Sequence, residues 1–134
     1  METWVLIGRV LFVLILLGSG IGHLTTLEAT GAHAESRGLK PGKAMAALSG
    51  LAFLAAGVAV LLGIWMDLAL LLLAALMVIV AFTMHQFWTM SGDEQQMEMS
   101  HFMKNLNIAG GSLMAFGLMN LLNYSDLTLT DLVF

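Results

Sequence analysis

Polar side chains that could bind a ligand or move a proton occur near the ends of long apolar stretches of this sequence. Histidine, lysine and asparagine can donate hydrogen bonds, and histidine can also take up or release a proton near neutral pH. Two of these histidines close separate apolar stretches, and three further polar residues follow one another at helical spacing in another stretch. We predict that these residues converge, with a tryptophan close by, in one ligand-binding cluster of His23, His85, Trp88, His101, Lys104 and Asn105.

An amphipathic ring such as a quinone suits a cluster of this kind. Its carbonyl oxygens need positioned donors, and a histidine could deliver or remove the proton that accompanies its reduction. The alternative is that the same residues lie at the membrane interface and only hold the helices together, with tryptophan and histidine as anchors. The sequence leaves both interpretations open.

Two charged residues lie inside the apolar stretches and are predicted to meet. Arg9 is 14 residues before His23, which leaves the two within about 40° on one helix face, and Asp67 is 18 residues, or five turns, before His85. A charge in hydrocarbon is costly and normally finds a partner in the bundle interior. We therefore predict a structural ion pair between Arg9 and Asp67.

The composition indicates that lipid surrounds most of the chain. Of 134 residues, 59% are hydrophobic and only 10% are charged, and the mean hydropathy is +0.90. A chain this short cannot cover so much apolar surface with its own core. An intrinsically disordered protein and a nucleic-acid-binding protein are excluded, because charge is sparse and the net charge is -4.

Continuous apolar runs predict an all-α membrane four-helix bundle in a single transmembrane domain, residues 1–134. Each run is close to the ~20 residues that a helix needs to cross a bilayer. Continuous rather than alternating runs favour helices over barrel strands. The predicted spans are 4–24, 44–65, 66–88 and 99–122.

The connections between these spans carry information on topology. The turn around Gly63 to Asp67 is so short that the second and third spans form an antiparallel hairpin. Arg37, Lys40 and Lys43 lie in the first connection, which places it on the cytoplasmic side by the positive-inside tendency. The N-terminus is a poor secretory signal, because its first charged residue is acidic.

A metal site is not predicted. The segment from Glu98 to His101 has the spacing used in di-iron bundles, but those sites need a second such pair and two further carboxylates. The chain contains no cysteine, so it can form neither a thiolate metal site nor a disulfide. Any thiol chemistry would have to come from a partner.

The order of several short motifs resembles the DoxX family of small four-span membrane proteins. The resemblance extends over nearly the whole chain up to Asn123. It is carried by Arg9, Gly20-Ile21-Gly22-His23-Leu24, Gly38-Leu39-Lys40-Pro41, Gly50, Gly57, His85-Gln86-Phe87-Trp88, Glu98, Phe102-Met103-Lys104-Asn105-Leu106 and Gly110-Gly111.

The resemblance implies a compact four-helix bundle in a bacterial or archaeal cell membrane. Some relatives are linked to quinone reduction, as in thiosulfate:quinone oxidoreductase, and others to membrane-associated oxidoreductase complexes. The positions carried over from the family are Arg9, His23, His85, Trp88, Lys104 and Asn105.

Two functions therefore follow from the sequence. The first is a redox-linked membrane subunit that binds a quinone-like ligand and works with an oxidoreductase partner. The alternative is a non-catalytic membrane scaffold or assembly factor. A transporter is less favoured, because no inverted repeat or interrupted span is present. Small residues in the second span favour a homo-oligomer.

Overall fold

The described part of the chain is built from helices alone, as predicted. The computed structural model describes residues 2–123 and 128–134. Its elements are α1 (Glu2–Thr25), α2 (Leu27–Ser36), α3 (Gly42–Leu62), α4 (Met66–Met84), the short 3-10 helix η1 (Phe87–Thr89) and α5 (Gly92–Leu122). The all-α fold class is confirmed.

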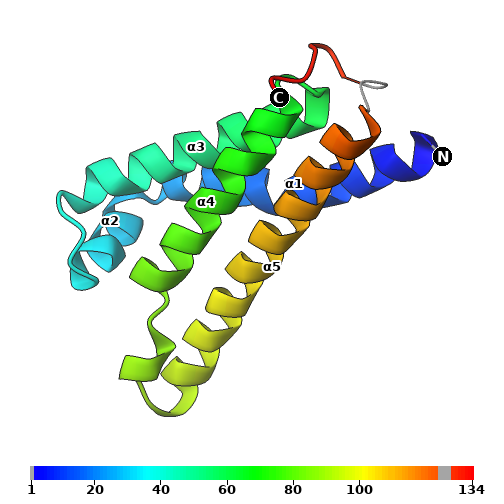
Figure 1. Cartoon of the computed structure of the whole chain (residues 1–134). Coiled ribbons are helices and arrows are strands. Elements are labelled where there is room, and N and C mark those ends of the chain that lie inside the picture. The colour runs from blue at the N-terminus through cyan, green and yellow to red at the C-terminus, as the bar shows by residue number, and fades with distance from the viewer. Residues whose placement is uncertain (1, 124–127) are drawn as a thin grey trace.

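The long helices associate as two pairs. Helix α1 packs along α3, and α4 packs along α5, whereas α3 and α4 touch over a shorter length. Figure 1 shows the two pairs meeting beside the α3–α4 turn and diverging toward the end that holds α2 and η1. The predicted hairpin is present. Helix α3 is followed by its C-cap Gly63 in a left-handed conformation (φ 68°), and α4 begins three residues after Gly63.

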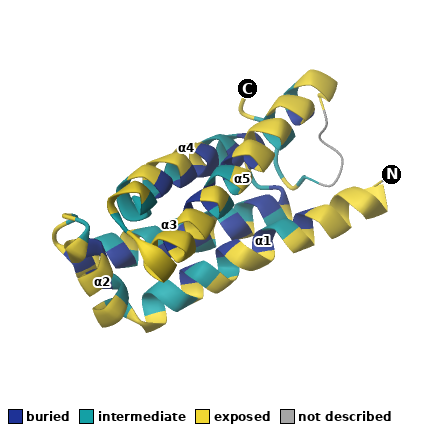
Figure 2. Ribbon diagram, turned by 90° about the horizontal axis from the view of Figure 1, so that it is seen from below, coloured by how far each residue is buried: buried dark blue, intermediate teal, exposed yellow. Residues whose placement is uncertain are grey.

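Three of the long helices are long and apolar enough to cross a membrane, among the residues described. They are Glu2–Thr25, Gly42–Leu62 and the segment Met66–Thr89. They carry exposed apolar side chains such as Leu11, Leu51 and Leu72. Figure 2 shows exposed positions, in yellow, along the long helices. The chain is therefore a multi-pass integral membrane protein, with lipid as the solvent for these side chains.

The last long helix differs from the prediction in its start and its polarity. Helix α5 begins at Gly92 rather than at residue 99, and Asp93 and Glu94 occupy its first turn. Acidic side chains favour a helix N-terminus because of the helix dipole. Residues 92–98, which lie between the predicted third and fourth spans, therefore form the start of α5, and the crossing of this more polar helix stays a prediction.

The first connection is also partly helical. Residues 27–36 form α2, which packs on the beginning of α3. The two helices approach closely because Gly42 and Gly31 face each other, so a Cβ at Gly42 would collide with the Gly31 carbonyl oxygen. The Gly42 amide also donates to Glu35 Oε1 at 3.0 Å. Helix α2 is thus held against the end of the first helix pair.

The C-terminal segment lies across the α3–α4 turn. The amides of Leu129 and Thr130 donate to the Gly63 carbonyl at 3.0 and 3.3 Å. Leu132 packs against an apolar cluster that includes Val60 and Leu70. Residues 128–134 therefore cover the end of the bundle at which the two helix pairs meet.

Candidate ligand-binding site

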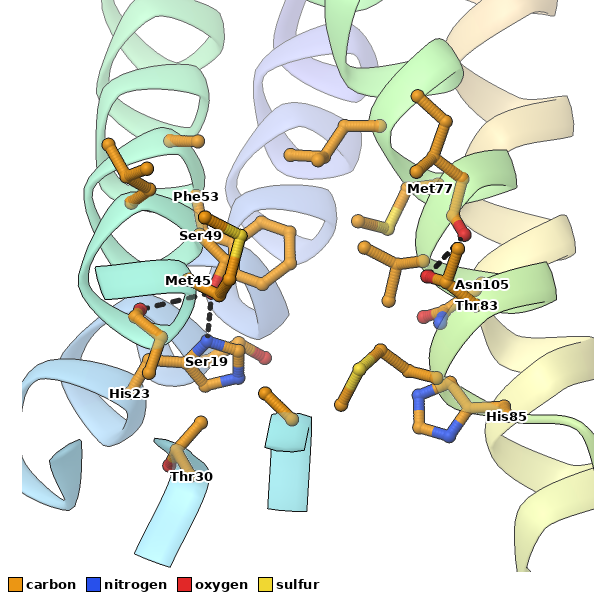
Figure 3. A pocket seen from close by; sticks show the side chains of 18 of the residues that line it. Ser19, His23, Thr30, Met45, Ser49, Phe53, Met77, Thr83, His85 and Asn105 are labelled. Atoms are coloured by element: carbon orange, nitrogen blue, oxygen red, sulfur yellow. Dashed lines mark hydrogen bonds between the residues drawn. The ribbon is translucent and has the colours of Figure 1, made fainter. Parts of the chain in front are cut away.

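A cavity of about 570 Å³ lies between the diverging helix pairs. Its body is apolar and includes Leu16, Phe53 and Met77. Polar side chains of five helices and the α4 C-cap lie along its wall: Ser19, His23, Thr30, His33, Ser49, Thr83, His85, Lys104 and Asn105. Figure 3 shows His23 and His85 on opposite sides, with their rings turned toward the space between the pairs. A cavity of this size and character suits an amphipathic small molecule.

His23 is fixed on the first wall by two neighbours on α3. Its Nδ1 lies 2.7 Å from Ser49 Oγ, and its ring meets the Phe53 ring edge-on with centroids 5.4 Å apart. The Ser49 hydroxyl in turn donates to the Ala46 carbonyl at 3.0 Å. The imidazole is thus held in one orientation, with its other nitrogen toward the cavity (Figure 3).

His85 is fixed on the second wall by a carboxylate. It caps the end of α4, and its Nδ1 lies 2.6 Å from Glu98 Oε2 on α5. The other oxygen of Glu98 accepts from Arg37 Nη2 at 3.2 Å, and Arg37 also lies 3.8 Å from the sulfur of Met90. One buried carboxylate therefore joins a cavity histidine to an arginine that follows α2.

The ionisation of Glu98 follows from its two hydrogen-bonding neighbours, His85 and Arg37. Burial raises the pKa of its carboxyl, but the hydrogen bond from His85 and the charges of His85 and Arg37 outweigh burial and hold the pKa below 4.5. Glu98 is therefore a carboxylate at neutral pH and can only accept hydrogen bonds.

Lys104 and Asn105 supply donors from α5. Both line the cavity, and Asn105 is only 4% exposed. Its Nδ2 is buried and has no hydrogen-bond partner among the described residues. A buried amide that is left unsatisfied costs free energy, which a ligand oxygen at this position would recover.

Two residues of the predicted cluster lie outside the cavity. His101 is exposed and stacks on His85, with ring centroids 5.2 Å apart. Trp88 is 50% exposed and packs edge-on against Phe102 at 5.8 Å. Neither lines the cavity. The cavity thus brings together His23, His85, Lys104 and Asn105, whereas His101 and Trp88 lie outside it.

Arg9 and Asp67 are both buried, at 5% and 0% exposure. The ion pairs recorded among residues 2–123 and 128–134 do not include one between them. Asp67 Oδ2 instead accepts the amides of Val133 and Phe134 at 2.7 and 2.9 Å. One oxygen of Asp67 thus contacts the C-terminal segment, and the pair of Arg9 with Asp67 stays a prediction.

Several site residues were not predicted as such. Ser49 is a polar residue within an otherwise apolar span, which was the available signal for it. The sequence indicates Arg37 only as a positive charge of the first connection, and Glu98 only as a residue weighed for a metal site and shared with the DoxX motifs. Their roles depend on the fold of α2 and on the early start of α5, which sequence spacing alone does not give. In the described residues no group of three or more His, Cys, Asp or Glu side chains could hold a metal ion.

Comparisons with known proteins agree with this architecture. The family model described as DoxX matches residues 4–86, which is more than half of the chain. No curated protein and no solved structure matches the chain. The matched region contains α1 to α4, including His23 and His85. The chain therefore belongs to the DoxX family.

Proposed function

We propose that this protein binds a quinone-like ligand in the cavity between its helix pairs, as the membrane subunit of an oxidoreductase system. The observation that carries the proposal is the convergence of His23, His85, Lys104 and Asn105 on one apolar cavity. These residues come from α1, the end of α4 and α5, and each polar side chain in an apolar setting costs free energy.

The cavity suits both parts of such a ligand. Its apolar body accommodates a hydrocarbon chain or ring face, and its walls supply the polar groups. Lys104 and the unsatisfied amide of Asn105 can donate to ring oxygens. The two helix pairs diverge at this end, so an apolar ligand reaches the cavity from the bilayer.

His85 is placed to accept a proton at this site. His85 contacts the cavity on one side and Glu98 on the other, at 2.6 Å. Arg37 extends the cluster from Glu98 to Glu94, whose side chain is 63% exposed and 4.0 Å from the guanidinium. A proton released in the cavity can therefore be accepted by His85, whose imidazolium form the Glu98 carboxylate would stabilise, close to the surface at which a soluble oxidoreductase partner would act.

Quinone binding to the purified protein in nanodiscs tests the proposal. We expect His85→Ala and Lys104→Ala to weaken the binding of a decyl-substituted benzoquinone about tenfold each, because each removes one polar contact of about 1.4 kcal/mol. His101→Ala is the matched control, since His101 lies beside His85 but outside the cavity. Unchanged affinity in both cavity variants would reject the site.

A scaffold is the second candidate function, and one observation favours it. Polar contacts of the cluster also join the two helix pairs, as Arg37 and Glu98 do. In a scaffold, the cavity variants would lower thermal stability and partner recovery together, with no effect of added quinone. A loss of quinone affinity at unchanged stability would separate the two functions.

A further inference from the structure

The hydrogen bonds of His23 define which of its nitrogens carries a proton. The Ser49 hydroxyl has one hydrogen, and we assign it to the Ala46 carbonyl at 3.0 Å, because a carbonyl oxygen can only accept. Ser49 Oγ can then only accept from the imidazole, so His23 Nδ1 is the protonated nitrogen in the contact of 2.7 Å. In a neutral ring the other nitrogen, Nε2, is left as a bare hydrogen-bond acceptor.

The same reasoning holds for His85 with a stronger acceptor. Its Nδ1 lies 2.6 Å from Glu98 Oε2. Glu98 is buried and also receives Arg37 Nη2 at 3.2 Å, so it is present as a carboxylate and has no proton to give. His85 Nδ1 is therefore the donor, and the Nε2 of the neutral ring is an acceptor. In Figure 3 the rings of both histidines are turned toward the cavity.

We infer that the cavity selects a ligand with two hydroxyl donors, the hydroquinone form of a quinone-like ring, over the oxidised dicarbonyl form. This inference rests on the proposed function and adds the redox state of the preferred ligand. A hydroquinone hydroxyl donates to a bare histidine nitrogen and accepts from a neighbouring N–H. A quinone carbonyl only accepts and leaves the nitrogens of His23 and His85 without a donor.

The remaining polar groups complement a hydroxyl as well. Lys104 and Asn105 line the same cavity, and Asn105 Nδ2 has no partner among the described residues. They donate to the hydroxyl oxygens while the histidines accept the hydroxyl protons. Sites built to bind a hydroxyl group discriminate strongly against an analogue that lacks it, because their own polar groups are then unpaired.

Three probes that differ only at the ring oxygens test the inference. They are a decyl-substituted benzoquinone, its hydroquinone and the dimethyl ether of that hydroquinone, titrated anaerobically at pH 8 by calorimetry into the full chain in nanodiscs. Histidine side chains are normally neutral at this pH. We expect the hydroquinone to bind at least about tenfold more tightly than either other probe, since a single lost hydrogen bond is worth about this factor.

Variants assign that preference to the two histidines. His23→Ala and His85→Ala should each reduce the ratio of hydroquinone to quinone affinity. Glu98→Gln should reduce it too, because an amide can donate to His85 Nδ1 and so permits the other tautomer. His101→Ala, outside the cavity, should leave the ratio unchanged. A helix-packing role for Glu98 would lower stability without changing this ratio.

The possible results separate the inference from the proposed function. If the quinone binds as tightly as the hydroquinone and Lys104→Ala still weakens binding, the selectivity is refuted and the site stands. If none of the probes binds, the proposed function fails and the inference fails with it.

Nitrogen NMR provides a test that does not use a ligand. The chain has four histidines, so ¹⁵N-histidine labelling gives few signals. We expect His23 and His85 to carry the proton on Nδ1, with the exposed His33 and His101 as references. A proton on Nε2 in both His23 and His85 would overturn the inference.

Discussion

Glu98 joins the two halves of the molecule through a single side chain. It is 4% exposed and lies on α5, yet its two oxygens contact His85 at the end of α4 and Arg37 after α2. A buried carboxylate is tolerated when it is paired and hydrogen-bonded, and both of its oxygens have partners here. The orientation of His85 toward the cavity therefore depends on Glu98.

The pH dependence of stability should report this carboxylate. Because the pKa of Glu98 is below its ordinary value of 4.5, its ionised form stabilises the fold. That contribution is complete above about pH 4.5 and is lost as the pH falls through the lowered pKa. We expect the wild type to lose about 1–3 kcal/mol more than Glu98→Gln between about pH 5 and pH 3, the value of hydrogen bonds to a charged group.

Thermal unfolding in detergent across this range is the measurement. Glu94→Gln is the matched control, because Glu94 lies on the same helix but its side chain is 63% exposed. Parallel acid profiles for the wild type and Glu98→Gln would contradict the role given to Glu98.

The residues of the site could be predicted from sequence only where polarity was out of place. Polar groups in apolar helices cost free energy and usually have a partner or a function. This cost draws attention to His23, His85, Lys104 and Asn105. Ser49 and Glu98 act through partners that are 26 and 13 positions away in the sequence, so their roles required the fold. The ion pair of Arg9 with Asp67 stays a prediction, and the amide contacts of the C-terminal segment with Asp67 Oδ2 are ones that no sequence periodicity reports.

At the scale of the elements, close approach of α1 and α3 depends on glycine. A Cβ at Gly20 would lie 2.8 Å from the Gly50 carbonyl oxygen and 2.7 Å from Leu54 Cγ. Small residues permit such contacts between helices in lipid. This packing also positions His23, one turn after Gly20, against the α3 residue Ser49.

A pair of alanine substitutions tests this packing. Gly20→Ala should destabilise the protein by about 1–3 kcal/mol through overpacking and should weaken probe binding at His23. Gly18→Ala, two residues earlier, is the control, because a Cβ there meets nothing within 4 Å. Equal thermal stability of the two variants would show that α1 and α3 do not need this contact.

The C-terminal segment is an element whose position depends on one carboxylate. Asp67→Ala would leave the amides of Val133 and Phe134 without their acceptor, at a cost of about 1–3 kcal/mol. We expect hydrogen exchange at both amides to become faster and residues 128–134 to become sensitive to protease. Asp131→Ala, an exposed position in the same segment, should leave both unchanged. Protected amides in Asp67→Ala would refute this anchoring role.

At the scale of the elements, the sequence predicted helix type better than helix extent. Long apolar runs without proline predicted α1, α3 and α4 to within a few residues. The sequence predicts a connection where α2 lies, because charged and polar residues in a chain this apolar are typical of a loop between spans. Its helical form is stabilised by packing on α3 through Gly31 and Gly42, a tertiary contact that local sequence does not show.

At the scale of the whole molecule, the two helix pairs are joined differently at their two ends. The α3–α4 turn and the C-terminal segment connect them at one end. At the cavity end, the contacts of Arg37 with Glu98 and Met90 cross from one pair to the other. The opening of the cavity should therefore depend on Arg37.

Spin-label distances measure this opening directly. The chain has no cysteine, so labels at Ala32→Cys on α2 and Gln95→Cys on α5 report only the chosen pair. We expect Arg37→Ala to give a longer and broader distance distribution, because it removes the ion pair that crosses the mouth. Lys43→Ala is the control, since Lys43 forms an exposed ion pair with Glu28 that joins α3 to α2 and does not reach α4 or α5. An unchanged distribution in Arg37→Ala would show that the pairs are held without it.

The cavity wall also has a consequence for how relatives diverge. The family match ends at residue 86, one position after His85, whereas Lys104, Asn105 and Glu98 all lie on α5 beyond it. The histidines of both walls thus lie within the matched region, whereas the α5 donors and the carboxylate that orients His85 lie beyond it. A chimera that exchanges only α5 with another family member would replace Lys104, Asn105 and the partner of His85 while both cavity histidines are retained.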